Sequence, residues 1–123
     1  MDKPVIVIVE DDEKSRRLMH DVLVYQGYEV VDADRGETGL DLIRARHPAL
    51  VLMDIHLPGI SGLDAIRAIR ADPAIAATPV VAVTAAATSD APATYRDAGF
   101  DGFQPKPLAM NDFLGTIRRL VPL

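Results

Sequence analysis

Short runs of apolar residues alternate with segments of helical periodicity, and this alternation constrains the fold more than any other feature of the chain. The first run, Val5–Val9, contains only valine and isoleucine, which is typical of a strand buried on both faces of a parallel sheet. Residues 15–26 carry apolar side chains at helical spacing and are followed by Gly27, a common helix stop. The pattern occurs five times, so it predicts an α/β protein built from strand–helix units.

The remaining elements follow the same pattern. We expect strands at 28–33, 49–53, 79–83 and 101–104, and helices at 36–46, 62–71, 90–98 and 109–121. Five units are too few for a closed barrel, which needs eight units and about 250 residues. We therefore expect a doubly wound five-stranded parallel sheet, (βα)5, with the flavodoxin-like strand order 2-1-3-4-5. Pro105 has no N–H to donate to a sheet, which agrees with a fifth strand at the edge.

Two further expectations concern side chains on the helices. On the first helix we expect Met19, Leu23 and Tyr25 to be core residues, unless one of them is exposed for docking of a kinase. Asp90 is a suitable N-cap for the helix at 90–98.

Composition excludes several functional classes. The 18 acidic and 13 basic residues give a net charge of −5, and no continuous basic stripe occurs, so we expect no nucleic-acid partner. The chain has no cysteine, which excludes disulfides and thiol chemistry. No apolar run approaches the roughly 20 residues of a membrane span, and the N-terminus lacks the features of a signal peptide. We expect one cytoplasmic domain over residues 1–123 with no membrane partner.

Polar residues stand at the ends of the predicted strands, where chemistry is expected. In an open parallel sheet, ligands bind at the carboxyl ends of the strands, beside the point where the strand order reverses. Here that point lies between the first and third strands. The residues that end or follow strands one, three, four and five are Glu10, Asp11, Asp12, Asp54, Thr84 and Lys106. We expect three or four of these carboxylates, the Thr84 hydroxyl and the Lys106 ammonium to converge on one edge of the sheet, with Asp12 favoured as an acid at the N-terminus of the following helix.

The residue types at this edge indicate phosphoryl chemistry. Crowded carboxylates repel one another unless some are protonated or a cation is present. Oxygen ligands without histidine or cysteine favour Mg²⁺, which commonly retains waters and binds phosphate oxygens. Lys106 and Thr84 could bind the same phosphoryl group. Asp54 follows the central strand and is the best-placed nucleophile for an aspartyl phosphate, with Glu10 and Asp11 holding the metal.

Four motifs, taken in order, resemble the receiver domain of bacterial two-component response regulators. They are VEDD at 9–12, MDIHLPGISG at 53–62, VTA at 83–85 and KP at 106–107. The resemblance covers essentially the whole chain and is strongest to single-domain members of the DivK-like type. It implies a receiver domain without an output domain, so that the signal passes through contacts with other proteins.

The resemblance also implies a role for each residue of the acidic edge. Asp54 would accept a phosphoryl group from a phosphohistidine on a sensor histidine kinase or a histidine phosphotransfer protein. Mg²⁺ would be bound by Glu10, Asp11, Asp54 and the backbone carbonyl of His56. Such a protein catalyses its own phosphorylation and dephosphorylation, so it is a phosphoacceptor and not an enzyme with a separate substrate. We expect a monomer or weak dimer.

Three further residues would respond to phosphorylation. Lys106 would pair with the phosphoryl group, and Thr84 would move toward it. Phe103 would follow Thr84 inward as a switch residue, although it lacks the hydroxyl of the tyrosine often found in the family. The resemblance further implies a cis peptide bond between Lys106 and Pro107. His56 and Ala86, two residues beyond Asp54 and Thr84, occupy positions that modulate phosphate lifetime in the family.

Three other functions make different demands on these residues. A flavodoxin-like cofactor binder would need a phosphate-binding loop after the first strand, where Glu10, Asp11 and Asp12 would repel phosphate. A phosphatase of the haloacid dehalogenase type would need its nucleophile in an Asp-x-Asp pattern after that strand. A receiver-like interaction scaffold that is not phosphorylated stays open as the alternative.

Overall fold

The computed structural model describes residues 3–85 and 91–123. In this part of the chain five strands alternate with five helices. They are β1 (Val5–Val9), α1 (Glu13–Gln26), β2 (Glu29–Ala33), α2 (Gly36–Arg46), β3 (Leu50–Met53), α3 (Gly62–Ala71), β4 (Val80–Thr84), α4 (Ala91–Ala98), β5 (Gly102–Pro105) and α5 (Met110–Leu120). No helix of the described residues is long and apolar enough to span a membrane.

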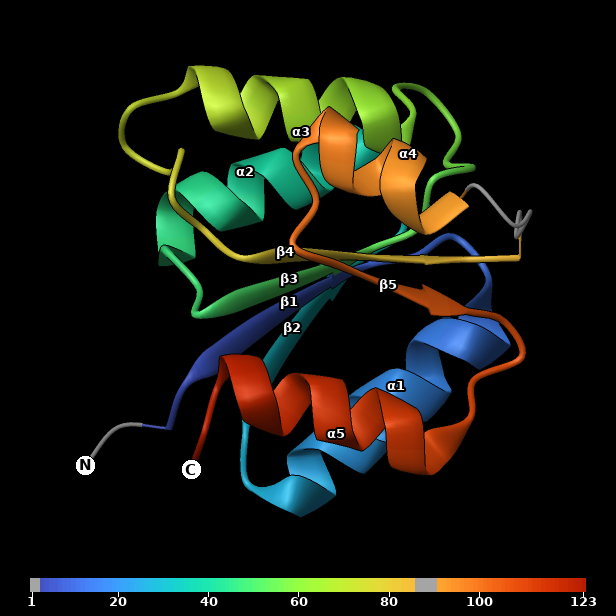
Figure 1. Ribbon diagram of the computed structural model, residues 1–123. Coiled ribbons are helices and arrows are strands. Elements are labelled where there is room, and N and C mark those ends of the chain that lie inside the picture. The colour runs from blue at the N-terminus through green and yellow to red at the C-terminus, as the bar shows by residue number, and fades with distance from the viewer. Residues whose placement is uncertain (1–2, 86–90) are drawn as a thin grey trace.

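The strands form one parallel sheet in the order β2-β1-β3-β4-β5, which confirms the predicted topology (Figure 1). In register, Val9 lies opposite Ala33 on one side and Met53 on the other. Met53 in turn lies opposite Ala82. The carboxyl ends of β1 and β3 are therefore level, and the residues that follow them lie at the same edge of the sheet.

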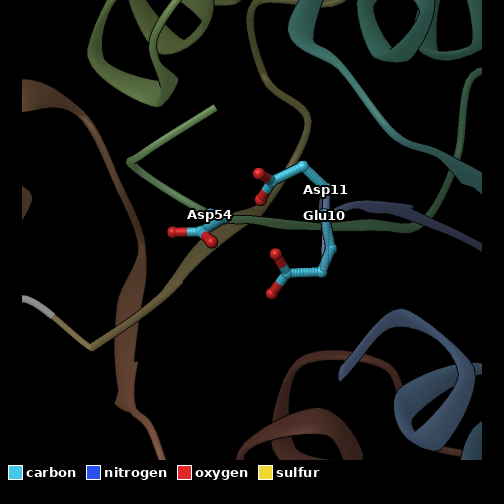
Figure 2. Close-up of side chains that lie close together, drawn as sticks. All are labelled: Glu10, Asp11 and Asp54. Atoms are coloured by element: carbon cyan, nitrogen blue, oxygen red, sulfur yellow. The ribbon is translucent and has the colours of Figure 1, made fainter. Parts of the chain in front are cut away.

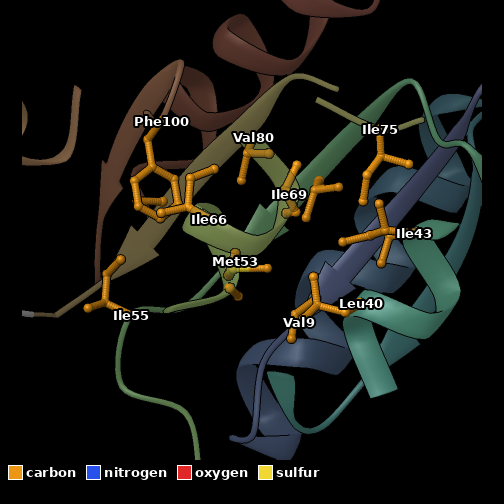
Figure 3. Packing of buried hydrophobic residues seen from close by; sticks show 14 of the residues in the cluster. Val9, Leu40, Ile43, Met53, Ile55, Ile66, Ile69, Ile75, Val80 and Phe100 are labelled. Atoms are coloured by element: carbon orange, nitrogen blue, oxygen red, sulfur yellow. The ribbon is translucent and has the colours of Figure 1, made fainter. Parts of the chain in front are cut away.

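Two apolar cores lie on the two faces of the sheet. Helices α2, α3 and α4 cover one face and α1 and α5 the other (Figure 1). Alternate strand residues point to opposite faces, so Val7 and Val9 join the core beneath α2 and α3, whereas Ile6 and Ile8 join the core beneath α1 and α5. In the first core the side chains of Leu40 and Ile43 on α2 and of Ile66 and Ile69 on α3 gather against the sheet (Figure 3).

The first helix differs from expectation at Tyr25. Met19 and Leu23 are buried as predicted, but the Tyr25 side chain is 88% exposed. Tyr25 is two residues beyond Leu23, a rotation of about 200° around the helix, so it points away from the sheet. Its prediction as a core residue was wrong. We had allowed that one of these three side chains is exposed, and that residue is Tyr25.

The fifth strand is shifted by one residue from its predicted bounds. It starts at Gly102. Just before it, the Asp101 N–H donates to the Val80 carbonyl at 2.7 Å, and the Asp101 carboxylate accepts hydrogen bonds from the Val80 N–H at 2.8 Å and the Arg70 guanidinium at 2.9 Å. The strand ends at Pro105, opposite Thr84, and lies at the edge as predicted. The predicted cap of α4, Asp90, lies outside the described residues.

Tyr28 was predicted to begin the second strand, but it lies before β2 and packs in the core beneath α1 and α5. Strand β2 begins one residue later, at Glu29, and the Tyr28 ring is 1% exposed. Its hydroxyl donates a 2.7 Å hydrogen bond to the carbonyl of Val121. This contact joins the start of β2 to the residue that follows α5.

Candidate functional site

Backbone hydrogen bonds position the two buried acids of the site. The N–H of Glu10 donates to the carbonyl of Ala33 at 3.0 Å, and the N–H of Asp54 donates to the carbonyl of Val9 at 3.0 Å. The sheet pattern thus continues one residue beyond β1 and β3. The Arg16 guanidinium of α1 donates to the Glu10 carbonyl at 3.0 Å. Both acids are therefore held by backbone contacts, independently of the charges on their side chains.

The side chains of Glu10, Asp11 and Asp54 converge as predicted. Each offers a carboxylate oxygen, and these atoms lie within 4.8 Å of one another. Figure 2 shows Asp11 and Glu10 approaching Asp54 from either side, so that the three carboxylates surround one small space. Glu10 and Asp54 are 1% and 7% exposed, whereas Asp11 is open to solvent.

Asp12, in contrast, has a structural role. It is the N-cap of α1, and its carboxylate accepts a hydrogen bond from the Ser15 N–H at 2.9 Å. This contact lowers the pKa of Asp12. Of the three consecutive acids after β1, the third therefore begins the helix, and the other two belong to the carboxylate cluster.

Lys106, which directly follows the edge strand β5, completes the cluster. Its ammonium group donates to the carboxylates of Glu10 and Asp54, the latter at 3.1 Å. The backbone places it there, since the Lys106 N–H donates to the Thr84 carbonyl at 3.1 Å. The Lys106–Pro107 peptide bond is cis, as the resemblance implied. One ammonium group thus contacts two of the three carboxylates.

Burial and neighbouring charges shift the ionisation of this cluster. The pKa of Glu10 is raised from 4.5 to about 7, chiefly by burial; the hydrogen bond from Lys106 opposes this shift, and Asp54 adds to it. Burial also disfavours the charge on Lys106, but its hydrogen bonds to Glu10 and Asp54 outweigh that effect and raise its pKa. Lys106 is therefore an ammonium at neutral pH, and Glu10 retains a proton near neutrality unless a further cation compensates its charge.

Thr84 and Phe103 lie on the same face of the sheet. Thr84 ends β4 and is fully buried. Phe103 lies opposite Ala82 in register, and because side chains alternate along a strand, Phe103 and Thr84 share the face covered by α4. The half-buried Phe103 ring stacks on Tyr95 of α4, with centroids 5.3 Å apart and planes at 28°. Tyr95 also packs edge-on against Phe100, with centroids 6.0 Å apart.

His56 contributes its backbone to the site and not its imidazole. The side chain is exposed, while its N–H donates to Asp54 Oδ1 at 3.2 Å. The other oxygen of Asp54 accepts from Lys106. Both oxygens of Asp54 are thus oriented by donors from different segments of the chain. Ala86, the other position expected to modulate phosphate lifetime, lies outside the described residues.

Sequence reasoning did not identify three residues that act around this site. They are Arg16, which holds the Glu10 carbonyl, Tyr95, which stacks on Phe103, and Glu37, which binds the loop after β3. Arg16 lies in the first turns of the helix after the acidic motif. From this position a long side chain can reach back to the backbone that precedes the helix. Nothing in the sequence signals the contacts of Tyr95 and Glu37. Both residues lie on helices, and they do not follow a strand at the edge of the sheet where the other site residues could be grouped.

The donor set fits a hard divalent cation. All three candidate side chains offer carboxylate oxygens, and no histidine nitrogen or cysteine sulfur belongs to this cluster of described residues. Oxygen ligands of this kind suit Mg²⁺, which binds few protein carboxylates and keeps several waters. The exposure of Asp11 leaves one side of the cluster open to water and to a ligand.

Comparison with known proteins identifies the family. The model of the response regulator receiver domain matches residues 6–118. This chain belongs to the receiver domain family of response regulators. It is 37% identical over 113 residues to the polar-differentiation response regulator DivK of Brucella ovis, an alignment that covers 92% of each chain. Phosphorylation and dependence on Mg²⁺ are general to the family.

Solved structures agree with this assignment. The receiver domain of a sensor histidine kinase from Pseudomonas aeruginosa, solved with a magnesium ion in its active-site cleft, matches with a TM-score of 0.87 and 25% identity over 96% of this chain and 97% of that one. The chemotaxis protein CheY4 of Vibrio cholerae shares the fold, with a TM-score of 0.88 and 22% identity over 97% and 99% of the two chains. Receiver domains in general bind Mg²⁺ at an acidic pocket of this kind.

Proposed function

We propose that Asp54 of this receiver domain is the phosphoacceptor of a two-component phosphorelay and that the chain signals by contact with other proteins. The observation that carries the proposal is the position of the Lys106 ammonium, which contacts both Glu10 and Asp54 beside the exposed Asp11. A lysine placed against a carboxylate cluster can bind the phosphoryl group that arrives there. The match over 92% of the length of DivK supports action as a single receiver domain.

Mg²⁺ would be held by the carboxylates of Glu10, Asp11 and Asp54 and by the backbone carbonyl of His56. When bound, the ion neutralises negative charge on the phosphoryl oxygens. Two features of the chain favour this site. The carboxylates already lie within 4.8 Å of one another, and the raised pKa of Glu10 reflects a buried carboxyl with too little positive charge around it.

Phosphoryl transfer would use Asp54 as the nucleophile. One of its oxygens forms the bond to phosphorus while the P–N bond of the donor phosphohistidine breaks and the imidazole leaves. Lys106 then pairs with a phosphoryl oxygen, and the Thr84 hydroxyl donates to another. Attack of water on phosphorus later restores the Asp54 carboxylate and releases phosphate. The same site thus serves phosphorylation and dephosphorylation without a separate substrate.

The response to phosphorylation would pass through Thr84 to Phe103. Both side chains lie on the face of the sheet beneath α4, so a shift of Thr84 toward the phosphoryl group leaves space that the Phe103 ring can enter. The stacking of Phe103 on Tyr95 ties α4 to the same movement. New charge on Asp54 would bias the equilibrium between two packings of α4, β5 and α5.

The outer face of α1 is suited to docking of a helical histidine phosphotransfer protein or of the corresponding domain of a sensor histidine kinase. Leu18 and Tyr25 are 48% and 88% exposed, and they lie seven residues apart, on one side of the helix. A cavity of about 150 Å³ at Leu18 is lined by Ser15, Leu18, Met19, Lys106, Pro107 and Leu108. The apolar surface thus borders the lysine of the proposed phosphorylation site.

Other classes of partner are less compatible with the surface. The net charge of −5 disfavours nucleic acid. Within the described residues, the large apolar side chains left exposed are Leu18, Val24, Tyr25 and Leu123. These are too few for the apolar core of an obligate dimer interface, which supports a monomer or a weak dimer.

Intact-protein mass spectrometry tests the proposal. The wild-type chain, incubated with a small phosphodonor and Mg²⁺, should gain one phosphoryl group, and Asp54→Asn should gain none. Asp34→Asn is the matched control, because Asp34 follows β2 at the same edge of the sheet but lies outside the carboxylate cluster; it should be phosphorylated like the wild type.

Each outcome separates the possible functions. Phosphorylation that persists in Asp54→Asn would reject Asp54 as the acceptor. A folded wild-type chain that is not phosphorylated by the small donor or by a phosphorylated histidine phosphotransfer protein would favour the scaffold without phosphorylation.

A further inference from the structure

The first turn of α2 contacts the loop that follows β3. Glu37, in that turn, accepts a 2.7 Å hydrogen bond from the N–H of Ile60 through Oε1. The Glu37 carboxylate also lies against the backbone of Gly59, where an added Cβ would be 2.3 Å from Oε1. Gly59 has a φ of 75°, a conformation that glycine adopts without strain. The loop and the carboxylate therefore fit closely at Gly59 and Ile60.

The opposite end of this loop is fastened to the phosphoacceptor strand. The N–H of Gly62 donates to the carbonyl of Ile55 at 2.9 Å. A Cβ at Gly62 would lie 2.4 Å from the Asp54 carbonyl oxygen, so the backbone of α3 begins directly against Asp54. With Ile55 held to Gly62 and Ile60 held to Glu37, only residues 56–59 lie between the two fixed points.

We infer that Glu37 is a positioning residue for the Mg²⁺ site: by holding Ile60 it places the loop that presents the backbone carbonyl of His56. This inference rests on the proposed function, in which that carbonyl is a ligand. A backbone ligand cannot be oriented by its own side-chain rotamer, so its place depends on what holds the loop. Groups that orient metal ligands contribute to metal affinity without touching the ion.

A purely structural role for Glu37 makes a different prediction. As an acid in the first turn of α2, Glu37 also interacts favourably with the helix dipole through its charge. Glutamine at this position loses the charge but keeps an oxygen that can accept the Ile60 hydrogen bond, whereas alanine loses both. The two substitutions therefore separate the hydrogen bond from the charge.

The test measures Mg²⁺ affinity and amide exchange of the full chain by NMR. In Glu37→Ala we expect Mg²⁺ to bind about three- to tenfold more weakly than in the wild type, and the Ile60 amide to exchange faster. Glu37→Gln should stay within about twofold of the wild-type affinity and keep Ile60 protected. Asp41→Ala is the control, since it removes an exposed acid from the same helix one turn further on; it should change neither quantity.

The inference is overturned if Glu37→Ala exposes Ile60 to exchange yet binds Mg²⁺ as tightly as the wild type. It is also overturned if Glu37→Gln is as weak as Glu37→Ala, because the charge would then be the cause. Failure of the proposed function looks different: the wild-type chain itself would show no saturable Mg²⁺ binding, or Asp54→Asn would bind Mg²⁺ unchanged.

Discussion

The raised pKa of Glu10 predicts that Mg²⁺ affinity depends on pH around neutrality. In the proposed site the Glu10 carboxylate binds Mg²⁺, so a proton on that group would compete with the metal. With a pKa of about 7 in the metal-free chain, the ionised fraction is about 0.9 at pH 8 and about 0.1 at pH 6. The apparent dissociation constant for Mg²⁺ should therefore be roughly tenfold larger at pH 6 than at pH 8.

The same group should make the metal-free protein less stable as the pH rises. Its pKa in the folded chain lies above the ordinary value of 4.5, so the folded state binds the proton more tightly than the unfolded state. The stability that this adds is fully present below pH 4.5 and is lost as the pH rises through about 7. Mg²⁺ should reverse the loss, because in the proposed site it binds the folded chain with its carboxylates ionised.

Calorimetric titration of Mg²⁺ between pH 6 and pH 8, with thermal melts in parallel, tests this reasoning. Glu10→Gln should bind Mg²⁺ weakly and with little dependence on pH. His56→Gln is the control, since it replaces the exposed imidazole of the loop after β3, and it should retain the tenfold effect. An affinity that is constant between pH 6 and pH 8 in the wild type, or an unchanged pH dependence in Glu10→Gln, would refute the assignment to Glu10.

Two further predictions concern the packing that supports the site. Tyr28→Phe removes the donor of a buried hydrogen bond to Val121 and should lower the free energy of unfolding by about 1–2 kcal/mol, measured by urea denaturation; an unchanged midpoint would contradict the buried bond. Gly62→Ala should cost more than about 1 kcal/mol and also impair phosphorylation, because its Cβ would lie 2.4 Å from the Asp54 carbonyl oxygen. Gly115→Ala on α5 is the comparison, because no atom lies within 4 Å of its Cβ. It should raise the free energy of unfolding by about 0.5–1 kcal/mol. Equal effects of the two substitutions would contradict the close approach at Gly62.

The proposed site was predictable because its residues follow strands. Lys106 and Glu10 are 96 residues apart in the sequence, yet both come directly after strands of one parallel sheet. Once the alternation of strands and helices indicates such a sheet, the ends of its strands must lie at a common edge, whatever the details of packing. The carboxylates of Glu10, Asp11 and Asp54 could be grouped for the same reason.

Contacts made by side chains between helices and loops followed no such rule. Tyr25 and Leu23 were both assigned to the core, but two residues along a helix turn the side chain by about 200°, so the burial of Leu23 leaves Tyr25 in solvent. The contacts of Asp101, whose carboxylate binds the Val80 N–H and Arg70 from other parts of the chain, were likewise not predicted. Asp101 has no feature in the sequence that distinguishes it from other exposed acids.

The sequence by itself thus determined the α/β class, the strand order and the acidic edge with its lysine. These follow from the local periodicity of apolar residues and from the geometry of parallel sheets. Only the tertiary structure decided that Glu37 holds the loop of the proposed Mg²⁺ site and that Tyr95 stacks on Phe103. Such contacts depend on how each helix is rotated and placed on the sheet, and that is settled by the packing of the whole core.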